Sequence, residues 1–130
     1  MSIRSYRDLR VWQRGMDLVA EVYEVTREFP QEERFGLTSQ MRRSAISVPS
    51  NIAEGFGRES NGDFARFLRV AQGSLKELET QLLVSQRLDM LAADDADATL
   101  GKCDEIGRIL RGLISKVRDD QRTTTDHRRP

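Results

Sequence analysis

Apolar residues recur at alternating spacings of three and four positions in four long segments of the chain. This spacing gathers apolar side chains on one face of an α-helix. The predicted helices span about residues 8–29, 36–56, 63–90 and 94–119. Short turns separate them, so neighbouring helices should run antiparallel. The sequence therefore predicts an all-α fold, an antiparallel up-and-down four-helix bundle in residues 1–119.

The third and fourth helices carry the most regular apolar stripes, as expected for a left-handed bundle. Their members are Phe64, Leu68, Ala71, Leu75, Leu78, Leu82 and Ser85, and then Ala96, Leu100, Cys103, Gly107, Leu110, Ile114 and Val117. Asp94, Asp95 and Asp97 open the fourth helix, where the helix dipole favours carboxylates. Residues 120–130 are polar and aperiodic, which predicts a disordered C-terminal tail.

The second helix contains a proline and a polar side. Pro49 removes one backbone hydrogen bond, so we expect a kinked second helix in which the hydroxyl of Ser44 or Ser47 reaches a freed carbonyl. The polar side should face solvent or a neighbouring subunit; its members are Arg42, Arg43, Ser47, Ser50, Asn51 and Glu54.

The first helix differs from the others because it carries two apolar rows. One row holds Leu9, Trp12, Met16, Ala20 and Tyr23; the other holds Val11, Leu18, Val22, Val25 and Phe29. A four-helix monomer can cover only one row, and an exposed apolar row marks an interface. We expect a homo-oligomer, with the second row as the candidate oligomer interface. The alternative is that one subunit buries the helix on both sides.

The composition limits the classes of protein to which the chain can belong. The 130 residues suit one domain, and the 38% hydrophobic and 32% charged residues suit a helix-rich protein. Because 21 cationic residues balance 21 acidic ones, the net charge attracts neither nucleic acid nor membrane. No segment suits a signal peptide or a membrane span, so we expect a cytoplasmic protein without membrane association. The single cysteine, Cys103, is expected in the core.

Candidate catalytic chemistry is sparse. The only histidine, His127, lies in the predicted tail, so a nucleophile–histidine pair or a histidine metal site lacks its partner. The glycines at 55 and 57 are better explained by helix termination than by a phosphate loop, since no strand precedes them. We therefore expect no enzyme, no metal and no cofactor.

Local charge differs from the total. Residues 34–76 hold seven cations and three acidic residues, and six of the cations are arginine, which suits phosphate contact. They could form a basic rim for RNA or DNA, or ordinary ion pairs on a solvated face. The candidate nucleic-acid contacts are Arg42, Arg43, Arg58, Arg66, Arg69 and Lys76.

Several motifs resemble one known family, the four-helix-bundle proteins encoded in intervening sequences of bacterial 23S ribosomal RNA genes. The similar segments are residues 6–12 (YRDLRVW), 35–43 (FGLTSQMRR), 47–55 (SVPSNIAEG) and 63–82, so the resemblance runs to about Leu91. It implies an up-and-down bundle that assembles into a ring-shaped homopentamer.

The resemblance also implies kinship with the accessory variability protein of diversity-generating retroelements. That protein is a similar pentamer that contacts a reverse transcriptase and nucleic acid through basic surfaces. Carried to this chain, it suggests Arg42, Arg43, Arg58 and Arg66 as surface contacts. Two functions stay open: an oligomer that binds RNA or DNA, and a protein-interaction scaffold that binds a protein partner and no nucleic acid.

Overall fold

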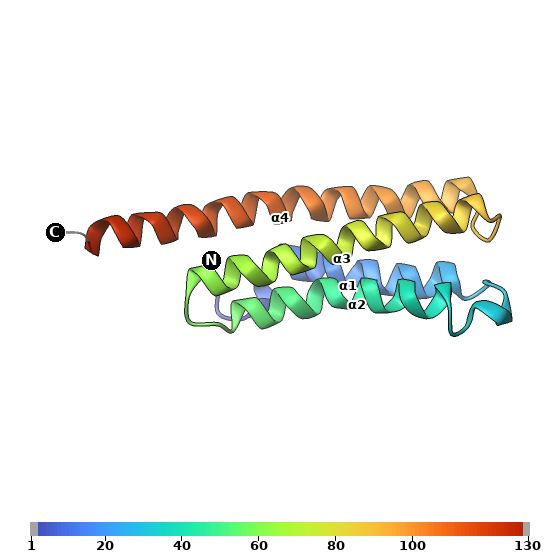
Figure 1. Ribbon diagram of the computed structural model, residues 1–130, viewed down its shortest axis with the longest axis horizontal. Coiled ribbons are helices and arrows are strands. Elements are labelled where there is room, and N and C mark those ends of the chain that lie inside the picture. The colour runs from blue at the N-terminus through green and yellow to red at the C-terminus, as the bar shows by residue number, and fades with distance from the viewer. Residues whose placement is uncertain (1–2, 129–130) are drawn as a thin grey trace.

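Four long helices and two short 3-10 helices make up the computed structural model, which describes the backbone of residues 3–128 and the side chains of residues 3–120. The order is η1 (Tyr6–Asp8), α1 (Arg10–Thr26), η2 (Gln31–Glu33), α2 (Leu37–Phe56), α3 (Asn61–Arg87) and α4 (Ala93–Arg128). Successive long helices run in opposite directions (Figure 1). The described residues contain no strand, so the predicted all-α bundle is confirmed.

Polar side chains cap the starts of η1 and α3. The Ser5 side chain accepts from the Arg7 amide, while the Asp8 carboxylate accepts from the Ser5 amide, which closes a capping box around η1 ahead of α1. Ser60 caps α3 by accepting from the Asp63 amide at 3.1 Å. Two acidic residues occupy the first turn of α4, as predicted.

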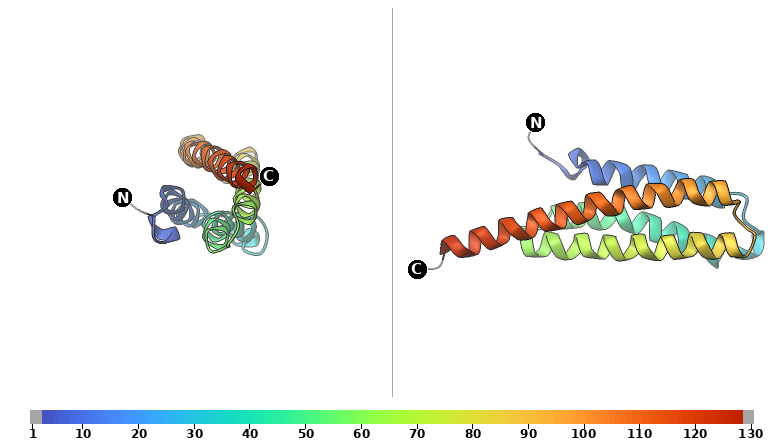
Figure 2. Two further views of the ribbon diagram at one scale, coloured as in Figure 1. Left: turned by 90° about the vertical axis from the view of Figure 1, so that its left-hand side faces the viewer. Right: turned by 90° about the horizontal axis from the view of Figure 1, so that it is seen from above.

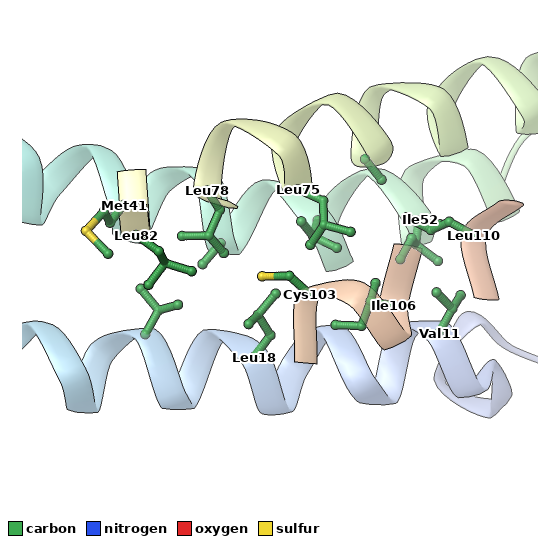
Figure 3. Packing of buried hydrophobic residues seen from close by; sticks show 14 of the residues in the cluster. Val11, Leu18, Met41, Ile52, Leu75, Leu78, Leu82, Cys103, Ile106 and Leu110 are labelled. Atoms are coloured by element: carbon green, nitrogen blue, oxygen red, sulfur yellow. The ribbon is translucent and has the colours of Figure 1, made fainter. Parts of the chain in front are cut away.

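One continuous core runs between the helices. Figure 3 shows how side chains from all four helices interdigitate, with Leu18 of α1 facing Cys103 of α4 and Leu75 of α3 nearby. The predicted stripes of α3 and α4 are buried from Leu68 to Ser85 and from Ala96 to Val117, except that Leu100 is half-buried. The prediction that Cys103 is a core residue is confirmed.

The row of α1 chosen as the oligomer interface lies in this core instead. Four of its members are buried and the fifth, Val25, is half-buried against the core; the buried four are Val11, Leu18, Val22 and Phe29. The prediction that this row forms the oligomer interface was therefore wrong. The buried row also includes Gly15, which has no side chain, and Thr26, which is polar. The spacing of large apolar residues therefore does not identify it. Met16 and Tyr23 of the other row face away from the core.

The serines of α2 do not act as predicted. The helix is continuous through Pro49, and the kink stays a prediction. Ser44 donates to Glu77 Oε1 at 2.8 Å, and Ser47 Oγ lies 2.7 Å from Ser74 Oγ. Neither reaches a freed carbonyl, because α3 offers partners on that side. Part of the polar side of α2 thus faces α3 of the same chain, not a neighbouring subunit.

Helix α4 is longer than the bundle around it. It continues to Arg128 without a proline or glycine after Gly112, so the helix passes the predicted boundary at 119. Figure 1 shows its end projecting beyond the α2–α3 turn. Residues 129–130 of the predicted tail lie outside the described residues. No described helix is long and apolar enough to cross a membrane.

Candidate nucleic-acid and assembly surfaces

The six predicted cations do not form one patch, and Arg42 is occupied inside the chain. Its Nε donates to Thr26 Oγ1 at 2.9 Å, and its guanidinium lies 4.4 Å from the centre of the Tyr23 ring. Thr26 in turn donates to the Val22 carbonyl at 2.7 Å. Arg42 therefore ties α2 to the end of α1, where a cation complements the helix dipole.

Arg58 and Arg66 meet around one aromatic ring at the α2–α3 turn. Their guanidinium carbons lie 4.8 Å and 4.7 Å from the centre of the Phe67 ring. Arg58 also pairs with Glu54 and Arg66 with Asp63, but these are exposed ion pairs of small energy. We call Arg58, Arg66 and Phe67 the Arg–Phe–Arg cluster.

Arg43 lies elsewhere, beside the polar seam between α2 and α3. It is exposed and lines a shallow hollow with Gln40, Ser44, Ser47, Ser74 and Glu77. The side-chain amide of Asn51 donates to the Ser47 carbonyl and hydroxyl at 2.8 and 2.9 Å. Most polar groups of the seam therefore find hydrogen-bond partners within the chain. This seam is a structural contact between helices, with one exposed arginine at its edge.

The two remaining candidates, Arg69 and Lys76, lie seven residues apart and so share one face of α3. Lys76 reaches Glu79 at 3.2 Å, and its charge acts on Cys103 of α4. This face therefore borders α4, which supplies none of the six predicted cations. Residues 106–118 contain no acidic residue, and this is the signal that reveals the cations on α4: Arg108, Arg111, Lys116 and Arg118.

An apolar groove separates the outer faces of α1 and α2. Its exposed centre is Met16 of α1 and Ile46 of α2, which are 45% and 42% exposed. We call this surface the α1/α2 groove; it is lined by Tyr6, Trp12, Met16, Val19, Ile46, Pro49, Ser50 and Ala53. The α1 row that the core leaves outside supplies part of this groove.

A second exposed apolar surface lies on α3, near the α3–α4 turn. It consists of Leu83, Val84 and Leu88, and we call it the α3 patch. In the bundle α1 packs against α2 and α4, while α3 packs against the same two helices. The groove and the patch therefore lie on different sides of the molecule, as the end-on view in Figure 2 makes clear for the helices that carry them.

Ion pairs join α1 to α4. Lys102 Nζ lies 3.0 Å from Glu21 Oε1, and Arg14 Nε lies 3.0 Å from Glu105 Oε1. The second contact is ionic only, because that Glu105 oxygen accepts no hydrogen bond. Among the described residues no cluster of histidine, cysteine and acidic side chains could hold a metal ion. Burial raises the pKa of the Cys103 thiol to about 12, so this thiol is protonated at neutral pH.

Residues 7–112 match the profile of the 23S rRNA-intervening sequence protein family, which covers most of the bundle. The chain belongs to this family. The resemblance seen in the motifs is thereby confirmed, and it extends through most of α4. No curated protein matches the chain.

A solved structure supports the fold of this family member. It is a protein with unknown function from the S23 ribosomal protein family of Bacteroides thetaiotaomicron. The two structures align with a TM-score of 0.73 at 21% identity, over 80% of this chain and 97% of the other. At that identity the likeness concerns the fold alone.

Proposed function

We propose that this intervening-sequence protein is a non-enzymatic homo-oligomer that binds RNA or DNA through arginines around α3. The observation that carries the nucleic-acid part is the Arg–Phe–Arg cluster. Two guanidinium groups flank an aromatic ring at an exposed helix turn, a combination that contacts phosphates and stacks on unpaired bases. We expect the protein to act in the cytoplasm, where RNA is abundant.

The assembly part is supported by the two apolar surfaces. The α1/α2 groove and the α3 patch expose large side chains that a single copy leaves in water. Because they lie on different sides, contact between the groove of one copy and the patch of the next is head-to-tail. Such a contact generates a ring when the rotation closes. A homopentamer, as the family resemblance implies, is one such ring.

The competing function is a scaffold that binds only another protein. Zero net charge favours it, as do the ion pairs that Arg58 and Arg66 already make with Glu54 and Asp63. A phosphate must displace these carboxylates, although exposed pairs are worth only about 0–1 kcal/mol. The two functions differ in their response to salt, because phosphate contacts release counterions and scaffold contacts with protein need not.

The deciding experiment is the solution mass, measured by light scattering after size exclusion at low and high salt, with and without a mixed RNA pool. We expect about five times 14.9 kDa for the protein alone. RNA should raise the mass at low salt only. A pentamer that ignores RNA at every salt concentration would favour the scaffold, and a monomer would contradict the assembly.

A matched pair of variants locates the binding. Arg58→Ala with Arg66→Ala removes the cluster, whereas Arg27→Ala with Arg34→Ala removes two exposed cations near the α1–α2 connection. Each pair lowers the net charge by two. If the cluster binds nucleic acid, only the first pair should lose affinity while the oligomer mass stays the same.

A further inference from the structure

A second cationic surface extends along the junction of α3 and α4. Its members are Arg69 and Lys76 from α3 and Arg111 and Arg118 from α4, and we call it the α3/α4 track. Each pair is spaced by seven residues, so its two side chains project from the same face of their helix, about 10.5 Å apart.

The position of Gly107 against Leu75 shows how the two helices are aligned. A Cβ at Gly107 would lie 3.6 Å from Leu75 Cδ2, so these positions are level along the bundle axis. The same Cβ would lie 3.7 Å from Arg111 Nη1, which shows that this guanidinium folds back over Gly107. Arg111 is thereby placed beside α3, close to the level of Lys76.

Antiparallel alignment from this point interleaves the four cations. The backbone of Arg111 stands four residues beyond Gly107 and that of Arg118 eleven, so they come level with about residues 71 and 64 of α3. Only the guanidinium of Arg111 reaches back towards the level of Lys76. The track then runs from the level of residue 64 to Lys76, a length of about 18 Å at 1.5 Å per residue. One strand of nucleic acid carries a phosphate about every 3.4 Å, so roughly five phosphates span it.

Charge on the track is largely unpaired. Among the residues that the structure describes, Arg69, Arg111 and Arg118 have no carboxylate within ion-pair distance, whereas Lys76 pairs with Glu79. All four side chains are exposed. Uncompensated cations in a row, with no aromatic side chain of α4 among them, suit the phosphate backbone and carry no means of reading a base.

We infer that the α3/α4 track binds the phosphodiester backbone of RNA or DNA without regard to base sequence, and this inference rests on the proposed function. The Arg–Phe–Arg cluster stands at the same end of α3 as Arg69, so one strand can contact both surfaces. The track positions the strand, and the cluster contacts unpaired bases.

The test measures the anisotropy of labelled 20-nucleotide oligouridine and oligodeoxycytidine, which differ in base and in sugar, titrated with the assembled full chain at several salt concentrations. The variant carries Arg69→Gln, Arg111→Gln and Arg118→Gln. We expect its affinity to fall at least about tenfold at low salt, and the slope of log affinity against log salt to become shallower by about two. Both strands should bind within about threefold of each other.

The control variant carries Arg7→Gln, Arg27→Gln and Arg34→Gln, which make the same change in net charge on other parts of the surface. It should keep its affinity within about twofold. Equal losses of affinity in the two triple variants would contradict binding at the α3/α4 track. A preference of about a hundredfold for one strand would contradict binding without regard to base sequence.

Two further outcomes separate this inference from the proposed function. If the wild-type chain binds neither strand at any salt concentration, both the proposed function and the inference about the α3/α4 track are wrong. If Arg58→Gln with Arg66→Gln abolishes binding while the track variant binds normally, the track alone fails. Tighter binding to phosphatidylserine vesicles than to either strand would assign the face to a membrane surface and overturn the inference.

Discussion

Gly55 of α2 and Phe67 of α3 approach so closely that no side chain fits at position 55: a Cβ there would lie 2.7 Å from the Phe67 Cβ. The same Cβ would lie 3.0 Å from Phe64 Cδ1 and 3.2 Å from the Phe64 carbonyl oxygen. Phe56 and Phe64 pack edge to face beside this contact, with ring centres 5.9 Å apart. The α2–α3 turn, and the Arg–Phe–Arg cluster on it, are positioned by this glycine.

Gly55→Ala should therefore destabilise the protein. Overpacking costs about 1–3 kcal/mol, while exchanging a helical glycine for alanine returns at most about 1 kcal/mol. We expect a net loss of about 1–2 kcal/mol in the free energy of unfolding, measured in urea. Gly112→Ala is the matched control, because nothing lies within 4 Å of its Cβ position. The control should gain about 0.5–1 kcal/mol, and equal stability of the two variants would contradict the packing argument.

Arg42→Ala should reduce stability and leave nucleic-acid binding unchanged. It removes a charged hydrogen bond to Thr26 and a cation–π contact with Tyr23, together worth about 1–3 kcal/mol. Urea denaturation measures the first effect and anisotropy with labelled RNA the second. Arg43→Ala, one residue along the helix and exposed, should change stability by less than about 0.5 kcal/mol. A loss of RNA affinity in Arg42→Ala at unchanged stability would return Arg42 to the binding surface.

Charge placed in the α1/α2 groove should dissociate the assembly. Met16→Lys with Ile46→Lys puts two ammonium groups where an interface must be dry, while the exposure of both residues spares the core. We expect the solution mass to fall to that of one chain, 14.9 kDa, with helicity by circular dichroism unchanged. Val70→Lys alters an equally exposed apolar residue of α3 outside the groove and should keep the assembled mass. An intact oligomer in the double variant would rule the groove out.

The buried thiol should be inert until the bundle opens. With the pKa of Cys103 at about 12, thiolate is scarce at pH 8, and we expect modification by a thiol reagent about a thousandfold slower than in urea. Between pH 9 and pH 12 the unfolded chain releases the thiol proton and the folded chain keeps it. This group therefore lowers stability as pH rises through that window. The difference between wild type and Cys103→Ala isolates the effect, and a difference that does not vary from pH 8 to pH 11 would contradict it.

Sequence periodicity was sufficient for the fold but not for the orientation of α1. The stripes of α3 and α4 identified their buried residues because each contains one clear row. On α1 the buried row includes Gly15 and Thr26, which no search for large apolar residues selects. Gly15 occupies a core position because Pro49 of α2 approaches it: a Cβ there would lie 3.3 Å from the Pro49 Cβ. This contact joins two helices, so the sequence of α1 alone does not predict that Gly15 is buried.

The surroundings of the candidate cations were likewise not predictable from the sequence, because they depend on contacts between helices. Their positions along the sequence allowed either a basic rim or ordinary ion pairs. In the structure Arg42 contacts α1, and Arg43 lies apart from the cluster at the α2–α3 turn. Arg111 and Arg118 lie outside residues 34–76, the segment whose cationic surplus suggested the basic rim. Which cations share a surface depends on how α3 and α4 align, and the position of Gly107 against Leu75 shows that alignment only in the folded chain.

Among the described side chains, ion pairs join α1 to α4, so the strength of this junction depends on the salt concentration of the buffer. Salt screens exposed charges over roughly 8–10 Å, whereas the hydrogen bonds and apolar contacts between α2 and α3 depend on it much less. Amide protons of α1 should accordingly exchange with solvent sooner than those of α2 and α3 as ionic strength rises. In the proposed oligomer, α1 also supplies half of the α1/α2 groove. Loosening of α1 at its α4 edge would then weaken the contact between one subunit and the next.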